Sequence, residues 1–250
     1  MNPSRFKDHF SAHASDYAEA RPRYPEELFA WLAERTAGHD AAWDCGTGNG
    51  QAALGLAAYY ARVVATDPSA KQISNAFPHP RVTYRVTKAE SRGLPAQSMD
   101  LVTAAQAAHW FELPRFYDQA RSVLKPQGVI AIWCYGLCCI DPAIDAVVQE
   151  FYSGEIAAYW PPERALIDDG YRSLDFPFQA IPPPPLQMRH AWTLSQFLAY
   201  LRTWSAVQKF MDHKARDPVP ALRTRLEKLW GKVDASRDVI WPLHIHAGRI

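Results

Sequence analysis

The sequence predicts an α/β protein with a doubly wound, mostly parallel sheet and a helical lid inserted after the fifth strand. Short apolar runs alternate with helix patterns over the first 135 residues, which is typical of right-handed β-α-β units with helices on both faces of one sheet. A glycine-rich stretch follows the first apolar run. After Gly136 the alternation gives way to long helix patterns and proline-rich stretches, which indicate a separate covering region.

The elements of the first half follow from local signals. A helix is predicted over 25–35, because Pro25 suits the first helical position and two acidic residues follow it. The fourth strand is largely apolar, so we expect it near the middle of the sheet. The stretch "KPQG" predicts a turn before the fifth strand. The expected strands lie at 41–44, 62–67, 81–87, 98–107 and 129–135, and the helices between them at 50–61, 69–77 and 114–124.

The second half predicts longer helices, at 141–160, 194–210 and 222–233. Four consecutive prolines at 182–185 predict a stiff, extended link to an edge strand. The tail alternates apolar and polar residues, which predicts one last strand, and Pro242 places that strand at an edge or end because it has no N–H to donate.

Three regions are therefore expected. They are a core with an N-terminal arm at 1–136, a helical lid and substrate region with a late strand at 137–236, and a C-terminal strand of the same sheet at 237–250.

The charge balance is close to neutral, with 27 basic and 26 acidic residues and a net charge of +1. A nucleic-acid or membrane-surface partner favours a strongly basic protein, so we expect neither. No apolar run reaches the length of a membrane span, and the first residues lack a signal-peptide pattern, so a cytoplasmic location is expected. Four cysteines are too few for a disulfide scaffold and are expected as thiols. The oligomeric state is left open.

The stretch "DCGTGNG", residues 44–50, points to a bound ligand. Glycine costs conformational entropy, so three in one loop indicate close approach to the backbone, and such a loop faces the carboxyl edge of the sheet. A phosphate-binding P-loop needs Lys-Ser/Thr after the glycines, and a dinucleotide fingerprint needs G-x-G-x-x-G; the sequence has neither. A nucleoside without phosphates, held by its ribose and a charged amino-acid tail, remains.

These residues resemble the first motif of the class I S-adenosylmethionine-dependent methyltransferases. "ATDPSAKQI" resembles the end of that family's second strand, "TKAESRGLPAQSMDLVTAAQAAHWF" its third and fourth strand ends, and "RSVLKPQGVIAIW" the helix, turn and strand that close its Rossmann-like core. The resemblance covers roughly residues 10–136. "SDYAEARPRYPEELFAWL", "AAQAAHWF", "YLRTWSAVQKF" and "WPLHIHAG" resemble the type 11 branch, which includes trans-aconitate methyltransferases. One departure is Gln127, where the family turn has glycine.

The resemblance implies S-adenosylmethionine as cofactor and a set of residues that bind it. Asp67, about twenty positions after the first glycine, would accept hydrogen bonds from the ribose hydroxyls. Ala89 and Glu90 would lie near the adenine. An N-terminal arm would fold over the cofactor, with an arginine on its carboxylate and tyrosines near the sulfonium. The expected cofactor-binding residues are Tyr17, Arg21, Tyr24, Asp44, Gly46, Gly48, Gly50, Asp67, Pro68, Ala89, Glu90 and Gln106.

The expected methyl acceptor is a small molecule, and the branch resemblance favours a carboxylic acid esterified at oxygen. Lid arginines can clamp a carboxylate in bidentate geometry, although each arginine alone is also explained as a solvated helix charge. The expected substrate-binding residues are Trp110, Trp160, Arg164 and Arg202.

His109 lies just beyond the carboxyl end of the predicted fourth strand and is the candidate catalytic residue. Three roles are open: a general base for a hydroxyl substrate, a donor that orients a carboxylate, and a structural contact. Because a carboxylate has no proton to lose at neutral pH, the acid hypothesis favours the orienting role.

Two other functions share the predicted fold: an NAD(P)-dependent oxidoreductase and a non-catalytic nucleoside sensor. Tyr84 and Lys88 match the Tyr-x-x-x-Lys pair of short-chain dehydrogenases, but that pair requires a helix, and on a strand the two residues lie about 13 Å apart. The stretch "QAAHW" lacks the Asp/Asn-Pro-Pro-Tyr motif, which argues against amino methylation of nucleobases.

No metal site is expected. His244 and His246 share a strand face, but no third ligand is evident. Cys134, Cys138 and Cys139 lie near the end of the fifth strand, where three thiolates could bind a soft metalloid as an alternative methyl acceptor; buried structural cysteines are the simpler explanation.

Overall fold

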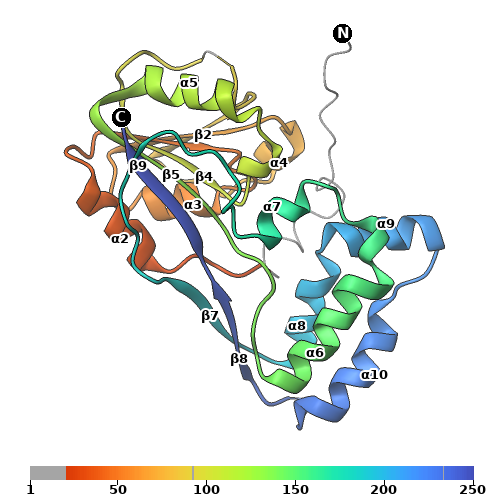
Figure 1. Ribbon diagram of the computed structural model, residues 1–250. Coiled ribbons are helices and arrows are strands. Elements are labelled where there is room, and N and C mark those ends of the chain that lie inside the picture. The colour runs from red at the N-terminus through yellow and green to blue at the C-terminus, as the bar shows by residue number, and fades with distance from the viewer. Residues whose placement is uncertain (1–20, 92, 233) are drawn as a thin grey trace.

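The protein is described by a computed structural model for residues 21–91, 93–232 and 234–250. A seven-stranded sheet in the order β3-β2-β1-β4-β5-β9-β6 forms its centre (Figure 1). β1 to β5 are parallel, and β9 is antiparallel to both β5 and β6. The predicted α/β, doubly wound, mostly parallel fold is confirmed. The strands are β1 (Ala41–Cys45), β2 (Arg62–Asp67), β3 (Val82–Val86), β4 (Met99–Ala105), β5 (Leu124–Cys134), β6 (Gln179–Ala180) and β9 (His244–Arg249).

Helices cover both faces of this sheet, and the side chains of β5 show how. Val129, Ala131 and Trp133 belong to one buried cluster, which also contains residues of α2 and α3. The alternate residues Ile130 and Ile132 belong to a second cluster, with residues of α5. Because side chains of a strand alternate between faces, the sheet is buried on both sides. The helices of this core are α2 (Glu26–Arg35), α3 (Gln51–Leu56), α4 (Ala70–Ser74) and α5 (Leu113–Val123).

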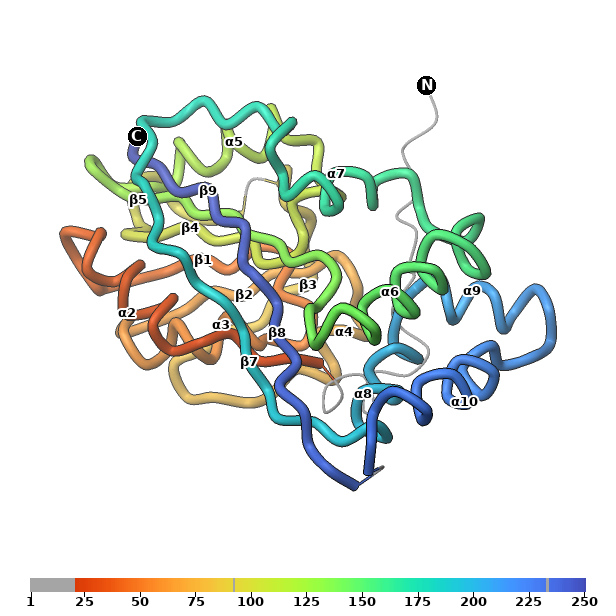
Figure 2. Tube along the Cα trace, turned by 60° about the horizontal axis from the view of Figure 1, so that its bottom comes forward, coloured from red at the N-terminus to blue at the C-terminus, as the bar shows by residue number. Residues whose placement is uncertain are grey.

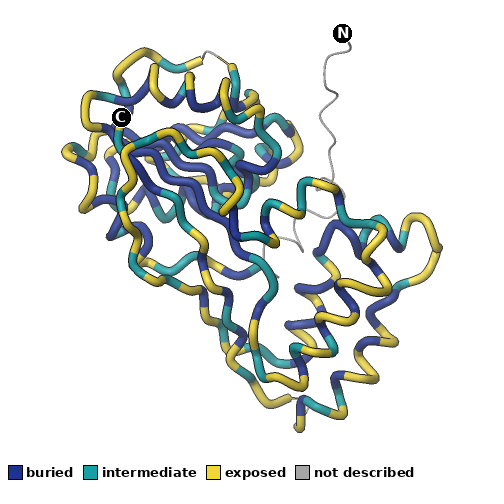
Figure 3. Tube along the Cα trace, in the orientation of Figure 1, coloured by how far each residue is buried: buried dark blue, intermediate teal, exposed yellow. Residues whose placement is uncertain are grey.

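The region between β5 and β9 holds most of the remaining helices and a two-stranded ribbon. In Figures 1 and 2 the helices form a second body beside the sheet, and β7 and β8 run side by side between the two. The outer helix faces are exposed and the inner ones buried (Figure 3). The elements are α6 (Pro142–Glu150), η2 (Phe151–Glu155), η3 (Ala157–Tyr159), α7 (Arg164–Asp168), β7 (Gln187–Trp192), α8 (Leu194–Arg202), α9 (Ser205–Lys214), α10 (Val219–Trp230) and β8 (Arg237–Pro242).

Two predicted elements need correction. The expected single helix at 194–210 is two helices, because the chain becomes extended at Trp204 and the Thr203 hydroxyl donates to the Tyr200 carbonyl at 2.7 Å, which closes α8. The turn expected in "KPQG" lies within β5, where the register against β4 shifts and Gln127 has φ +65°. An irregularity of this kind adds residues to one strand only, which a turn signal does not distinguish from a chain reversal.

The tail expected as one strand of the sheet is also divided. Only β9 joins the central sheet, and it lies between β5 and β6 rather than at an edge. β8, which contains Pro242, pairs with β7 in the separate two-stranded ribbon, so this strand does lie at an edge as predicted. Pro242 ends β8, so the missing N–H falls at a strand end, where it interrupts no ladder.

Candidate functional site

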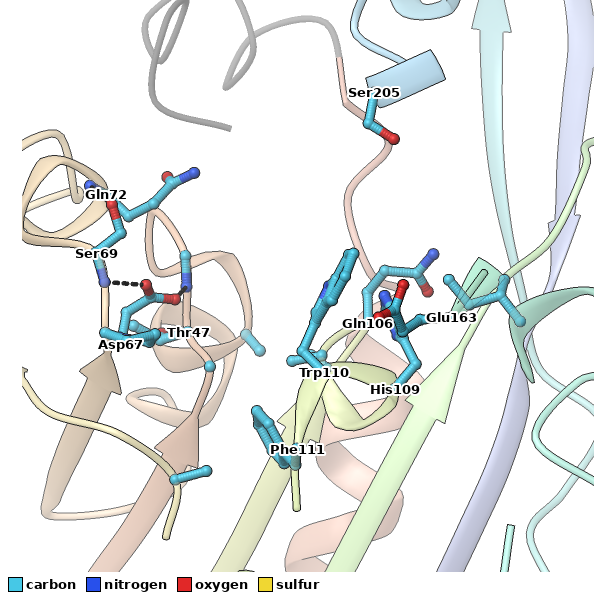
Figure 4. A pocket seen from close by; sticks show the side chains of 18 of the residues that line it. Thr47, Asp67, Ser69, Gln72, Gln106, His109, Trp110, Phe111, Glu163 and Ser205 are labelled. Carbon is cyan, nitrogen blue, oxygen red and sulfur yellow. Dashed lines mark hydrogen bonds between the residues drawn. The ribbon is translucent and has the colours of Figure 1, made fainter. Parts of the chain in front are cut away.

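A cavity of about 640 Å³ opens at the carboxyl ends of β1, β2 and β4 and extends under the helical region. This edge is where ligands bind in open α/β sheets, and the volume suits a small-molecule site. In Figure 4, Asp67 and Ser69 lie on one side of the cavity, and Gln106, His109 and Glu163 on the other. The residues expected from the sequence that line it are Arg21, Tyr24, Gly46, Gly48, Asp67, Pro68, Ala89, Glu90, Gln106, His109, Trp110, Trp160 and Arg164.

The glycine loop presents bare backbone to the cavity. Gly46 and Gly48 have φ +68° and +56°, values that residues with a side chain rarely adopt. A Cβ on Gly48 would meet nothing within 4 Å, so it would occupy the cavity itself. A Cβ on Gly46 would lie 2.6 Å from the Ala107 Cβ. Gly46 is therefore required by packing, and Gly48 leaves space for a ligand.

Asp67 ends β2 and faces the loop. Its carboxylate accepts hydrogen bonds from the backbone N–H of Gly48 at 2.9 Å and of Ser69 at 2.8 Å. Asp67 lines the cavity, and a carboxylate oxygen is an acceptor for hydroxyl groups.

Asp44 and Gly50 do not line the cavity, which corrects the expectation that they contact the cofactor. The Asp44 side chain is fully buried and accepts hydrogen bonds from the hydroxyls of Thr47 and Thr103. Burial raises its pKa to about 6. Gly50 has φ +92° and begins α3, and a side chain there would collide with Tyr84. Both residues support the loop on the side away from the cavity.

The N-terminal arm reaches the opposite wall. Arg21 donates from Nη1 to the Tyr135 hydroxyl at 3.3 Å and from Nη2 to the Thr203 carbonyl at 3.2 Å. Tyr24 packs edge-on against Trp133, with ring centroids 5.6 Å apart. Tyr17, the third residue expected from the arm, lies outside the described residues.

Gln106 joins the ends of β4 and β5 at the cavity wall. Its side-chain amide donates to the Tyr135 carbonyl at 3.0 Å and accepts from the Tyr135 N–H at 2.8 Å. The residue itself has φ +53°. The side-chain amide thus hydrogen-bonds both the N–H and the carbonyl of Tyr135, so the Gln106 side chain is held in place at the cavity wall.

His109 lies in the short helix η1 (Ala108–Trp110) and is buried, with 8% of its surface exposed. Its Nδ1 is 2.8 Å from the Tyr171 hydroxyl. Burial, with the positive charge of Arg164, lowers the pKa of His109 to about 3. The imidazole is therefore neutral at physiological pH.

Arg164 begins α7, and its positive charge acts on His109. Its Nε donates to the Tyr152 hydroxyl at 2.8 Å and to Asp168 at 3.1 Å, and its guanidinium lies 4.8 Å from the Trp160 ring centroid. Within the described part of the chain, no residue accepts a hydrogen bond from its two Nη groups. Those donors are available to a ligand.

Arg202 does not line the cavity, which corrects its assignment to the substrate. Its Nε donates to Asp217 at 3.0 Å, and 45% of its side chain is exposed. Arg202 is the last residue of α8, and the break at Trp204 turns the following residues, rather than this arginine, toward the cavity.

The sequence patterns did not identify several lining residues, among them Glu163, Tyr200 and Ser205. Tyr200 and Ser205 flank the break between α8 and α9, which a continuous helical pattern conceals. Spacing along one predicted helix face therefore gave no signal for them. The density of aromatic residues in "YLRTW" was the available hint, since aromatic side chains favour ligand pockets.

The cysteines and paired histidines form no evident metal site. Burial raises the pKa of Cys134 to about 12 and that of Cys138 still further, which keeps both as thiols. Within residues 21–91, 93–232 and 234–250, no group of three His, Cys, Asp or Glu side chains is arranged to hold a metal ion. In the same ranges no helix is long and apolar enough to span a bilayer.

Known proteins are similar to this chain in sequence and in architecture. The methyltransferase domain family matches residues 43–132. A protein of Dictyostelium discoideum that is named as a methyltransferase is 34% identical over 250 aligned residues, which cover 97% of this chain and 95% of that protein. The chain belongs to the methyltransferases. The predicted family is thereby confirmed, together with S-adenosylmethionine as the methyl donor, whereas the trans-aconitate branch stays a prediction.

Two further relatives are similar to this methyltransferase. The solved structure of a protein named a type II methyltransferase, from Anaeromyxobacter dehalogenans, is 47% identical with a TM-score of 0.86, and the match covers 92% of this chain and 97% of that one. A protein of Saccharomyces cerevisiae named as S-adenosylmethionine-dependent is 30% identical over 138 residues, 52% of this chain and 46% of that protein.

The hydrogen-bonding groups that line the cavity fit S-adenosylmethionine. There is open space beside Gly48, and the Asp67 carboxylate at the cavity wall is of the kind that would accept hydrogen bonds from ribose hydroxyls. The Asn49 Nδ2 is buried with no hydrogen-bond partner among the described residues, and Asn49 lines the cavity. A buried amide donor left without a partner is costly, and a carboxylate or hydroxyl of the cofactor would satisfy it.

Proposed function

We propose that this methyltransferase esterifies a small carboxylic acid at oxygen, with Arg164 and His109 as the groups that hold the carboxylate. The observation that carries the proposal is that one cavity is lined by a neutral histidine and by an arginine whose Nη groups have no hydrogen-bond acceptor among the described residues. Arginine matches a carboxylate in bidentate geometry, and a charge-assisted hydrogen bond is stronger than a neutral one.

The cofactor site is proposed along the glycine loop and Asp67, with Pro68, Ala89 and Glu90 on the adenine side. When bound there, S-adenosylmethionine supplies an electrophilic methyl group. Arg21 and Tyr24 line the wall that faces the lid, so the arm helps to enclose the site. Tyr17 remains a candidate for the same arm.

The protein's contribution to the reaction is alignment and exclusion of water. Arg164 and His109 orient one acceptor oxygen, and the rings of Trp110, Trp160 and Trp204 wall the cavity against solvent. A carboxylate needs no base, and a histidine whose pKa is about 3 is a poor one near neutral pH. The site therefore favours acceptors that arrive already ionised.

The other acceptor classes and cofactors fit less well. Methylation of a soft metalloid requires thiolates, but Cys134 and Cys138 are kept protonated by burial. An NAD(P)-dependent oxidoreductase would need the dinucleotide fingerprint that the loop lacks. A small-molecule acceptor and a cytoplasmic location remain part of the proposal.

The test is a screen of carboxylic acids, phenols, amines and thiols for release of S-adenosylhomocysteine, followed by Arg164→Gln. We expect acids to turn over, and the variant to raise KM for them about 10- to 100-fold, the equivalent of one lost charge-assisted bond. Arg202→Gln is the matched control, since it removes a lid arginine that also pairs with an aspartate but lies outside the cavity. Turnover of amines or thiols alone would refute the proposed acceptor.

A further inference from the structure

We propose that Tyr171 is a positioning residue of this site: its hydroxyl holds His109 in the neutral tautomer that carries its proton on Nε2. The use of that proton on an acceptor oxygen rests on the proposed function, whereas the tautomer itself does not. Tyr171 lies outside the cavity lining, so it acts only through the histidine.

The hydrogen bond is short and fully enclosed. The Tyr171 hydroxyl lies 2.8 Å from His109 Nδ1, and none of the tyrosine surface is exposed. Water therefore does not compete for either atom. Among the described residues, Nε2 of His109 has no hydrogen-bond partner, and His109 lines the cavity.

The direction of this bond follows from the surroundings of the tyrosine oxygen. Within the described residues, His109 Nδ1 is the one hydrogen-bond partner of the Tyr171 hydroxyl, and the tyrosine is fully buried. A buried O–H left without an acceptor is costly, so the hydroxyl donates its proton to Nδ1. Nδ1 then accepts, and a neutral imidazole must carry its own proton on Nε2.

The backbone at Tyr171 is shaped for this contact. Gly170 and Tyr171 have φ +66° and +61° directly after α7. A bulky residue in the left-handed region is an outlier that surrounding structure must sustain. Here the Tyr171 N–H donates to the Leu166 carbonyl at 2.8 Å, and Gly170 packs against His244 where no Cβ fits. The residue with this backbone conformation is the one whose hydroxyl contacts His109 of η1.

One short segment therefore controls both donors of the acceptor subsite. Arg164 begins α7 and reaches the cavity directly, and Tyr171 follows its end and reaches His109. Loss of the tyrosine hydroxyl frees Nδ1 to take a proton, so Nε2 can face the cavity either as a donor or as an acceptor. We infer that Tyr171 keeps His109 a donor and prevents it from acting as an acceptor or a base.

The test is nitrogen-15 NMR of the imidazoles in the whole protein, with His109 assigned by its loss in His109→Gln. We expect wild-type His109 to show only the Nε2–H tautomer without titrating between pH 5 and 8. Tyr171→Phe, which keeps the ring, should give a mixture of tautomers. Tyr117→Phe is the matched control, because Tyr117 is also buried and its hydroxyl has no partner among the described residues. A wild-type proton on Nδ1, or an unchanged tautomer in Tyr171→Phe, overturns the inference.

Kinetics then separate this inference from the proposed acceptor. Tyr171→Phe should raise KM for the acceptor at least threefold. Its cofactor affinity and its melting temperature should differ from wild type by no more than those of Tyr117→Phe do. If the tautomer changes as expected but carboxylic acids are not substrates, the acceptor proposal fails and the assignment of Tyr171 stands. The wild-type spectrum alone decides the tautomer should Tyr171→Phe not fold.

Discussion

At the scale of single residues, the site is made by side chains that are held at both ends. Asp67 accepts two backbone amides, Gln106 bonds twice to Tyr135, and Arg164 is fixed through Nε while its Nη groups stay available. Such groups lose little further entropy when a ligand arrives, which is the physical meaning of preorganisation. Arg202 is held in a similar way by Asp217 but lies outside the cavity, so support alone does not make a site residue.

Replacing Asp67 should weaken cofactor binding. Asp67→Ala removes the acceptors for the ribose and also two hydrogen bonds to the loop. Loss of about 1.5–3 kcal/mol corresponds to a roughly 10- to 150-fold higher Kd, measured by titration calorimetry with S-adenosylmethionine. Asp40→Ala, at the opposite end of the sheet, is the control. Unchanged binding by Asp67→Ala would show that the cofactor lies elsewhere.

At the scale of elements, strand ends and helix starts carry the site. β1 leads into the glycine loop, β2 ends at Asp67, β4 leads to Gln106 and η1, and α7 supplies Arg164 from the lid. Because parallel strands end at the same edge, residues far apart in sequence meet there. The break between α8 and α9 contributes Trp204 and Ser205 to the cavity lining from the lid.

The two glycines of the loop should respond differently to alanine. Both changes are strained by the positive φ, by about 1 kcal/mol. Gly46→Ala would place its Cβ 2.6 Å from the Ala107 Cβ, which is a steric clash, and should therefore lower the melting temperature markedly. Gly48→Ala points into open space and should chiefly raise the Kd for cofactor. Calorimetry and thermal melts on both variants check this, and a Gly48→Ala protein with wild-type Kd would contradict it.

At the scale of the molecule, the lid and the sheet share one core. A single buried cluster contains Ala131 and Trp133 of β5 together with Leu201 of α8 and Leu226 of α10. α10 in turn packs on α6 and α8. Removal of the lid would therefore expose the apolar face of the sheet as well as open the cavity, so the lid is part of the folding unit.

Burial of neutral His109 should make the free energy of unfolding depend on pH. Its pKa is about 3 in the folded protein and 6.5 unfolded, so in this window the unfolded state binds the proton first and stability falls as pH falls. Asp44, whose pKa is raised to about 6, has the opposite sign between pH 4 and 6. From pH 7.5 to 5 wild type should lose about 2 kcal/mol relative to His109→Gln, measured by urea unfolding. The same dependence of the unfolding free energy on pH in the two proteins would contradict this.

The sequence by itself determined the sheet, its order of elements and the cofactor loop. Apolar runs of strand length, helix patterns between them and glycines at a strand end are local features, and they constrain the topology because β-α-β units have one hand. Strand β2 matches the predicted range 62–67. The family motifs lie in this same region, so the expected residues from Arg21 to Trp110, apart from Asp44 and Gly50, line the cavity.

Only the tertiary structure decided how the lid meets the site. The division of α8 from α9, the departure of β8 from the sheet and the exclusion of Arg202 all depend on packing between distant segments. Tyr171 reaches His109 across 62 positions of sequence through a left-handed residue that no local pattern signals. Local periodicity specifies which face of an element is buried, whereas the partner that buries it is chosen by the whole fold.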